Sequence, residues 1–218
     1  MQTSTMTHDN TTRALLMARA DACRLFAACF YPPDNQLFAR EKLGERLGAL
    51  LKTACPRAAS LLPPLGRYIE TENAEVLAVA YTRLFLGPPE VLAPPYASCY
   101  LDGERYVMGP SVVEIKKFYD SAGLGMDEDF TETPDHVSAM LEFLYYLNFR
   151  MAVAIAAGNP DEHEAMSHLQ NRFLEKYMKS WIPDFSGKII EADQHPFYTG
   201  LAQSLKAFIG EGFSGKNH

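Results

Sequence analysis

The sequence contains too few cysteines for the sites that depend on them. Four cysteines occur in 218 residues, and their spacings fit neither a CxxC metal knuckle nor a dense disulfide framework. We therefore expect Cys23, Cys29, Cys55 and Cys99 to be reduced thiols, most of them buried.

Basic residues are also scarce relative to acidic ones. Lysine and arginine number 20 against 27 aspartates and glutamates, which gives a formal net charge of −7. A nucleic-acid interface needs clustered lysine and arginine to displace counterions from phosphates, so the composition argues against one. An acidic surface suits a basic partner, or it simply keeps the protein in solution.

An uninterrupted apolar run is missing from the first thirty residues. Residues 1–12 are polar, and the apolar stretch that follows is broken by Arg13, Arg19, Asp21 and Arg24. This pattern fits neither a secretory signal nor a membrane span. It predicts a cytoplasmic protein.

Alternating strand patterns and internal repeats are absent, whereas apolar residues recur at helical spacing along most of the chain. With 47% hydrophobic residues the chain can bury one sizeable core. We predict a single-domain, all-α bundle of about eight to ten helices over residues 12–210, with a flexible N-terminus at 1–11 and a flexible tail at 211–218. The expected helices span residues 12–30, 37–51, 73–86, 111–123, 134–157 and 161–181, with one or two more in 185–209.

A proline-rich loop interrupts this pattern at residues 87–110. Five prolines alternate there with Tyr96, Tyr100 and Tyr106, which is too stiff a composition for a helix. Loops of this length inside a compact domain are usually functional or disordered, and the aromatic residues argue against disorder. After it, Ser111 and Glu114 have the spacing of a capping box for the next helix.

The helix start at residues 133–136 is the second unusual feature. Thr133 is expected as the N-cap and Pro134 as the first helical residue, which puts Asp135 and His136 in the first turn. The positive end of the helix favours an ionised Asp135 and a neutral His136. Capping is the preferred interpretation and acid–base catalysis the alternative, because no nucleophile motif lies nearby.

Metal and phosphate sites have little support. His163, Glu164 and His168 fit a solvated helix face better than a metal site, since no glutamate has a histidine three residues later, as di-iron bundles require. A phosphate-binding Gly-x-x-x-x-Gly-Lys-Ser/Thr loop is absent. We expect no bound metal.

Several segments, taken in order, resemble the TorD/DmsD family of redox-enzyme maturation chaperones. The resemblance covers roughly residues 18–209. The segments are Ala28-Cys-Phe30-Tyr31-Pro32-Pro33, Tyr81-Thr-Arg-Leu84-Phe85-Leu-Gly87-Pro88, Pro94-Pro95-Tyr96-Ala-Ser98-Cys-Tyr100-Leu101, Pro134-Asp135-His136, Leu141-Glu142-Phe143-Leu144, Trp181-Ile-Pro183-Asp-Phe185 and Phe197-Tyr198-x-x-Leu201-Ala202.

The resemblance implies a TorD-like helical fold and a chaperone rather than an enzyme. Its partner would be the precursor of a molybdenum-cofactor oxidoreductase of anaerobic respiration, of the dimethyl-sulfoxide or trimethylamine-oxide reductase type. The chaperone would bind the twin-arginine signal peptide and the apo form of this catalytic subunit in the cytoplasm, before export. The resemblance also implies a monomer or domain-swapped homodimer, and no cofactor other than weak guanine-nucleotide binding.

By position, the resemblance implies a peptide-binding patch. In our hypothesis, Glu132 and Asp135 meet the arginines of the peptide, while Leu84, Phe85 and Tyr96 meet its apolar part. The full patch comprises Tyr81, Leu84, Phe85, Pro88, Tyr96, Ser98, Glu132, Pro134, Asp135 and His136.

One position departs from the family pattern, and two other functions stay open. Family members often carry a histidine four residues before the late tryptophan, where this chain has Tyr177. The first alternative function is a small all-α enzyme, such as a nucleotide hydrolase, that uses Asp135 and His136 as acid and base. The second is a purely structural bundle whose loop packs on the core.

Overall fold

A computed structural model describes residues 2–71, 74–87, 90–103, 109–125 and 132–213 of the chain. Within these ranges there is no β-strand, only an isolated bridge between Tyr96 and His136. The prediction of an all-α fold is therefore confirmed. The α-helices are α1 Gln2–Cys29, α2 Asn35–Arg40, α3 Leu43–Ala54, α4 Pro56–Leu61, α5 Leu65–Thr71, α6 Ala74–Tyr81, α7 Ser98–Leu101, α8 Pro110–Ser121, α9 Val137–Ala157, α10 Pro160–Phe173, α11 Lys179–Ala192 and α12 Pro196–Glu211, and the π-helices are η1 Thr82–Leu86 and η2 Leu174–Met178.

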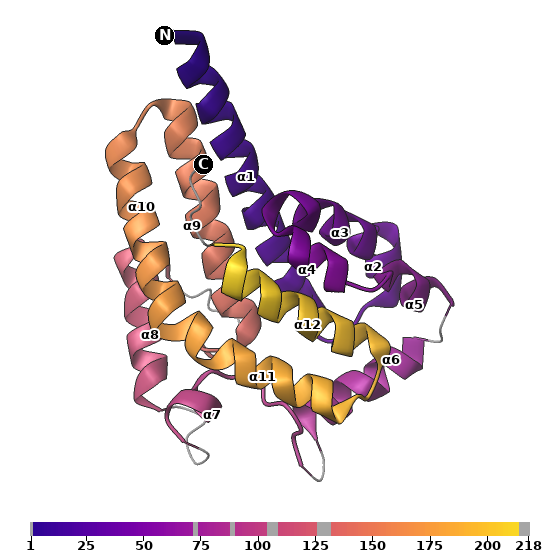
Figure 1. The fold of residues 1–218 in the computed structure, drawn as a ribbon. Coiled ribbons are helices and arrows are strands. Elements are labelled where there is room, and N and C mark those ends of the chain that lie inside the picture. The colour runs from indigo at the N-terminus through magenta and orange to yellow at the C-terminus, as the bar shows by residue number, and fades with distance from the viewer. Residues whose placement is uncertain (1, 72–73, 88–89, 104–108, 126–131, 214–218) are drawn as a thin grey trace.

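The long helices pack around one large core, and a second, small cluster of Leu16, Met151 and Ala152 lies between α1 and α9. Helix α9 packs against α1 and α10, while α12 packs against α11 and α4 (Figure 1). The largest fully buried side chains include Trp181, Tyr198, Phe26 and Phe30. The cysteines are free thiols, buried except for the partly exposed Cys99, as expected.

Helix α9 is the central core helix that the sequence predicts. It is long and apolar enough to cross a membrane by those criteria alone, yet 56% of its most apolar 18-residue window is buried in the protein. Gly158, with a φ of 66°, ends it in the left-handed conformation that glycine adopts without strain. The apolar composition of the helix is therefore explained mainly by its packing against α1 and α10.

Two predicted helix boundaries are wrong. Helix α1 begins at Gln2 rather than at residue 12, so residues expected to form a flexible N-terminus are the first turns of a helix. Helix α11 continues past Pro183 instead of ending before it. Proline removes one backbone hydrogen bond from a helix, but burial of Trp181, Ile182 and Phe185 in the core offsets this cost.

The four shortest α-helices, α2, α4, α5 and α7, have seven residues or fewer. Helices α4 and α5 follow proline breaks, and α7 lies inside the proline-rich loop. A helix of one or two turns shows no hydrophobic period. These short elements explain why the described residues contain more helices than the about eight to ten expected from periodicity.

The predicted Ser111–Glu114 capping box is also wrong. Helix α8 begins at Pro110, and the amide and hydroxyl of Ser111 both donate to Asp102 Oδ2, at 3.1 and 2.5 Å. Glu114 instead accepts hydrogen bonds from Lys176 and from the Tyr177 hydroxyl. Tyr177, the departure from the family pattern, thus ties η2 to α8.

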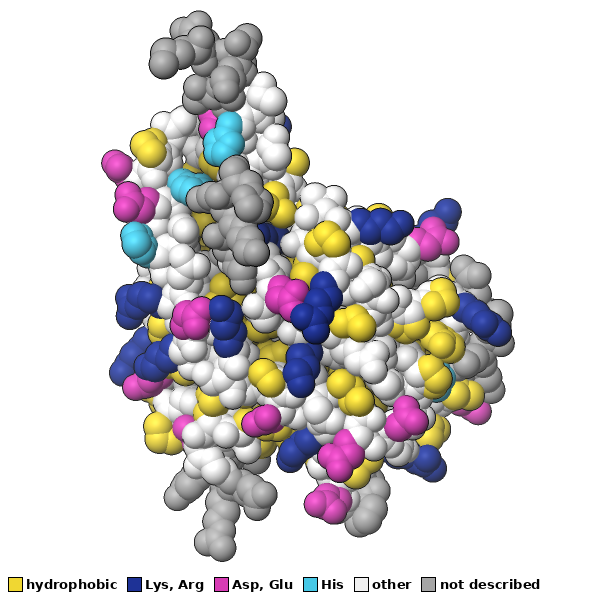
Figure 2. All heavy atoms as spheres, in the orientation of Figure 1, with side chains coloured by type: hydrophobic (Ala, Val, Ile, Leu, Met, Phe, Trp, Pro, Cys, Tyr) yellow, Lys and Arg dark blue, Asp and Glu magenta, His cyan; other side chains and the backbone are white. Residues whose placement is uncertain are grey.

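Charged side chains are interspersed over the surface. Figure 2 shows lysine, arginine and acidic side chains scattered over the face drawn, with apolar side chains between them and no broad basic patch.

Candidate functional site

The proline-rich loop and the start of α9 lie against each other. Around the bridge between Tyr96 and His136, the amide of Ala97 donates to the Asp135 carbonyl at 3.0 Å, and the amide of Val137 donates to the Pro95 carbonyl at 2.8 Å. These main-chain bonds hold the loop on the turn formed by residues 133–136. The sequence marked both segments as unusual, and the structure brings them together.

The N-cap of α9 is His136 rather than Thr133. Its Nδ1 accepts from the Ser138 amide at 3.2 Å, and Pro134 and Asp135 lie in a turn before the helix. The predicted cap fails because the amide of Val137 is already bonded to Pro95 in the loop. A capping rule considers only residues close in sequence, so it does not include the distant Pro95 carbonyl as an acceptor.

Asp135 is fully buried and organises the turn. Its Oδ2 accepts from the Ser98 amide at 3.0 Å, and its Oδ1 accepts from the Thr133 hydroxyl at 2.5 Å. The carboxylate thereby fastens α7 to the turn. Direct contact with an arginine of a partner would require an exposed carboxylate, and Asp135 has none of its surface exposed.

His136 lies between two tyrosine rings. The Tyr31 ring stacks on its imidazole with centroids 6.0 Å apart, and the Tyr96 ring meets it edge-on at 5.2 Å. Burial lowers the pKa of His136 below its ordinary value, although Glu132 and Asp135 nearby act in the opposite direction. A neutral imidazole is also what the cap requires, because Nδ1 must keep its lone pair.

Each of these tyrosines holds a glutamate. The Tyr96 hydroxyl donates to Glu132 Oε2 at 2.7 Å, and the Tyr31 hydroxyl donates to Glu142 Oε1 at 3.1 Å. Glu132 is partly exposed and Glu142 exposed. The site thus presents two accessible carboxylates on either side of a buried histidine, and we name Tyr31, Tyr96, Glu132, His136 and Glu142 the carboxylate site.

None of the ion pairs found in the described ranges includes Glu132, Asp135 or Glu142. Charged side chains that are partly removed from water are usually paired. Glu132 and Glu142, two accessible carboxylates that no ion pair within the described residues neutralises, therefore favour a cationic partner. Guanidinium groups suit such a site, since they bond carboxylates in a fixed geometry and stack on aromatic rings.

Three residues of the predicted patch lie in the core instead of on the surface. Tyr81, Leu84 and Phe85 are 5%, 0% and 3% exposed, and Phe85 packs against the rings of Phe30, Phe185 and Tyr198. The Tyr81 hydroxyl donates to the carbonyl of Phe30, the residue before Tyr31, at 3.4 Å, and burial together with the charge of Glu132 raises the pKa of Tyr81 to about 12. These three residues therefore belong to the core that packs next to the carboxylate site.

The remaining predicted residues are close to the turn or outside the described residues. Ser98 is buried and bonds Asp135 through its amide, and the Pro134 carbonyl accepts from the Tyr119 hydroxyl at 2.6 Å. Pro88 lies outside the described residues.

Sequence reasoning missed Tyr31 and Glu142 as members of the site. They belong to segments that carry the family resemblance, but they are 111 positions apart in the chain. No local pattern indicates that the end of α1 meets the second turn of α9. Only the packing of these two helices brings them together.

Clusters of metal ligands are not found in the described part of the chain. No group of three or more histidine, cysteine, aspartate or glutamate side chains there could hold a metal. Glu164 and His168 approach to 3.4 Å, but each is 74% exposed, as a solvated helix face should be.

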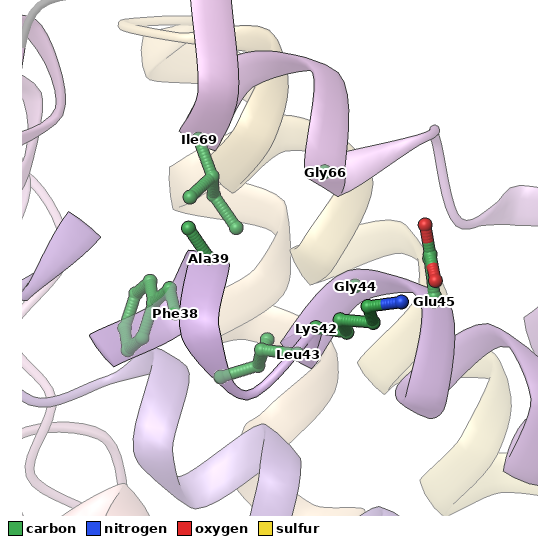
Figure 3. A pocket seen from close by; sticks show the side chains of 8 residues that line it. All are labelled: Phe38, Ala39, Lys42, Leu43, Gly44, Glu45, Gly66 and Ile69. Atoms are coloured by element: carbon green, nitrogen blue, oxygen red, sulfur yellow. The ribbon is translucent and has the colours of Figure 1, made fainter. Parts of the chain in front are cut away.

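A small hollow between α2, α3 and α5 is a packing gap (Figure 3). It has a volume of about 10 Å³, room for roughly one water molecule. Gly44 borders it, where a Cβ would lie 2.7 Å from the Cβ of Leu65. The glycine allows α3 and α5 to approach closely, and the gap is too small for a ligand.

Comparison with known proteins identifies relatives across most of the chain. Residues 52–186 match the family described as the nitrate reductase delta subunit. The Chaperone protein TorD of Vibrio parahaemolyticus is 30% identical over 70% of each chain. The Tat proofreading chaperone DmsD of Salmonella typhi is 29% identical, over 72% of this chain and 70% of its own. These relatives are named chaperones, not enzymes.

A solved structure supports the fold. It is a proposed redox enzyme maturation protein from Archaeoglobus fulgidus, which superposes with a TM-score of 0.57 over 88% of this chain and 94% of its own. Its sequence is 24% identical to this chain, so this likeness speaks for the architecture alone. The described helices therefore follow an architecture already seen in a crystal.

Proposed function

Because this chain belongs to the nitrate reductase delta subunit family, with the TorD and DmsD chaperones among its relatives, we propose that it is a cytoplasmic chaperone for one redox enzyme. In this proposal it binds the twin-arginine signal peptide and the apo form of a molybdenum-cofactor oxidoreductase before export. A reductase of dimethyl sulfoxide or trimethylamine oxide is the client type that the resemblance favours.

The observation that carries this proposal is that Glu132 and Glu142 are accessible and take part in no ion pair among the described residues. Two adjacent arginines need two acceptors that are accessible and held in place. Glu132 and Glu142 meet that need, since each is fixed by a tyrosine hydroxyl whose ring adjoins His136. The rings of Tyr31 and Tyr96 also offer faces on which guanidinium groups can stack.

Asp135 has a different role in this proposal from the one that the sequence suggested. We assign the contact with the arginines to Glu132 and Glu142, and make Asp135 a positioning residue. Its buried carboxylate holds the Ser98 amide and the Thr133 hydroxyl. It therefore fixes the loop that carries Tyr96 on the turn that carries His136.

Calorimetric titration with a twin-arginine peptide tests the proposal. Glu132→Gln and Glu142→Gln should each weaken binding about tenfold, which corresponds to about 1.4 kcal/mol for one charge-assisted hydrogen bond at a partly exposed site. Glu164→Gln is the matched control, because Glu164 is exposed on α10 and, among the described residues, its ion pair is with the equally exposed His168. Wild-type affinity in both site variants would refute the assignment.

A peptide with both arginines replaced by lysine separates recognition of geometry from recognition of charge. Lysine keeps the charge but lacks the planar fork and the stacking surface of the guanidinium group. We expect it to bind more weakly than the arginine peptide. Equal binding of the two peptides would mean that the site attracts charge without recognising arginine.

The hydrolase alternative has little support from the geometry. His136 Nδ1 accepts from the Ser138 amide, and the Asp135 oxygens accept from Ser98 and Thr133. Both groups are buried, so neither is free to meet a substrate as acid or base. Weak guanine-nucleotide binding and a domain-swapped dimer stay predictions, which nucleotide titration and light scattering can test.

A further inference from the structure

The exposed face of α9 is unusually apolar. Glu142 and Arg150 are the only charged residues among the 21 of this helix. Beyond Glu142, the outward face carries Tyr145, Phe149, Val153 and Ala156 at helical spacing, and we name these four residues the α9 stripe. Phe149 is 37% and Val153 42% exposed.

A helix on the surface of a globular protein normally turns a polar face to solvent. The other sides of α9 are used in the usual way, since they pack on α1 and α10. The rings of Tyr145 and Phe149 stack on each other with centroids 6.0 Å apart, and Arg24 of α1 lies 5.8 Å over the Tyr145 ring. Exposed apolar surface in a continuous row marks an interaction site more often than chance.

The α9 stripe is continuous with the carboxylate site. Glu142, which accepts from Tyr31, stands one helical turn before Tyr145. From position 142 to position 153 is 11 residues, or about 16 Å along a helix. The apolar segment of an export signal has about 7–15 residues, which spans about 10–22 Å when helical. A signal peptide whose arginines reach Glu142 therefore has an apolar segment of the right length to cover the stripe.

We propose that the α9 stripe docks the apolar segment of the same signal peptide, in line with its arginines at Glu132 and Glu142. This inference rests on the proposed function and identifies the second half of the binding surface. It replaces the expectation that Leu84 and Phe85 meet the apolar segment, because both are buried in the core.

Two other occupants fit the charges less well. An anionic lipid surface would be repelled by Glu132 and Glu142 and by a chain of net charge −7. A second copy of the chain, paired about a two-fold axis through this face, would set Glu132 and Glu142 of both copies close to one another. A peptide with arginines at one end and apolar residues after them complements the whole surface.

Two peptides and one double variant test the inference. The long peptide has the twin arginines and the apolar segment, and the short peptide has the same arginines followed by serine and glycine. Phe149→Gln with Val153→Gln should weaken binding of the long peptide at least about tenfold, because two apolar contacts are lost. It should leave the affinity for the short peptide unchanged. Val113→Gln is the matched control, since Val113 is a 58% exposed valine on a different helix, α8.

The outcomes separate this inference from the proposed function. Suppose that the wild type binds both peptides, and that the double variant keeps its affinity for both or loses affinity for both equally. The stripe then does not hold the apolar segment, and the inference fails while the proposed function stands. If the wild type binds neither peptide, the proposed function fails and the inference with it. Stripe-dependent binding to vesicles of anionic lipid, or stripe-dependent dimerisation without peptide, would likewise overturn the assignment to the peptide.

Discussion

Replacing Asp135 with alanine removes the buried carboxylate that fastens α7 to the turn before α9. In the structure this group has no exposed surface and accepts from the Ser98 amide and the Thr133 hydroxyl. The substitution leaves the Ser98 amide buried without its acceptor. We therefore expect a large loss of stability from a residue that the sequence suggested as a binding residue.

The magnitude follows from two opposing effects. A hydrogen bond to a charged group contributes about 1.5–3 kcal/mol, and an orphaned buried amide costs about 1–3 kcal/mol. Against this, the variant no longer buries a carboxylate that takes part in no ion pair among the described residues, and burying such a charge is unfavourable. Together these effects give an expected decrease of about 2–4 kcal/mol in the free energy of unfolding for Asp135→Ala.

Urea unfolding at neutral pH, followed by circular dichroism, measures this decrease. The transition midpoint should fall by about 1–2 M with an unchanged slope, since the slope reflects the surface exposed on unfolding. Asp135→Asn is the control, because its amide oxygen can still accept from the Ser98 amide, and it should lose less stability than the alanine variant.

A second measurement reports on α7 itself. Cys99 lies in this helix and is partly exposed, and burial raises the pKa of its thiol. When Asp135 no longer holds α7, the Cys99 thiol should react faster with a thiol reagent under native conditions. If Asp135→Ala changed stability by less than about 0.5 kcal/mol, the usual range of a surface substitution, and Cys99 reacted at the wild-type rate, the positioning role would be refuted.

Two further predictions concern pH and backbone packing. Burial lowers the folded-state pKa of His136 below that of the unfolded chain. As the pH falls, the imidazole is therefore protonated in the unfolded chain before it is protonated in the folded one. The contribution of His136 to stability is full above the unfolded pKa, about 6.5, and is lost as the pH falls from there through the folded-state pKa. Unfolding measured from pH 7 to 5 should show a smaller loss of stability in His136→Asn, which keeps a capping side chain, and an equal loss in both proteins would contradict this. Gly200→Ala should lower the free energy of unfolding by about 1–3 kcal/mol, because a Cβ there would lie 2.2 Å from Cδ of Pro63. An unchanged thermal midpoint would contradict this, since it would mean that α12 shifts to accommodate the methyl group without cost.

Local sequence patterns predicted the class of fold and the main helices. The apolar period of α9 identified it as the core helix, and the prolines of residues 87–110 identified a loop that carries aromatic residues to the site. These features are readable because helical period and proline geometry depend on residues only a few positions apart. The order of several such segments also predicted the family, which the comparisons confirm.

The sequence did not predict which side chains face solvent at the site. Leu84, Phe85 and Asp135 were expected to contact a peptide and are buried. Tyr31 and Glu142 were missed and lie at the carboxylate site. A residue inside a helical pattern can turn toward the core or away from it, and local spacing alone does not fix the direction of contact with distant segments.

By itself, then, the sequence determined an all-α chain with one long apolar helix, an acidic balance and an aromatic loop before a Pro-Asp-His turn. The tertiary structure decided the cap of that helix, since the Pro95 carbonyl takes the Val137 amide and leaves His136 to cap. It also decided the carboxylate site, because the packing of α1 on α9 brings Tyr31, just beyond α1, to Glu142 of α9.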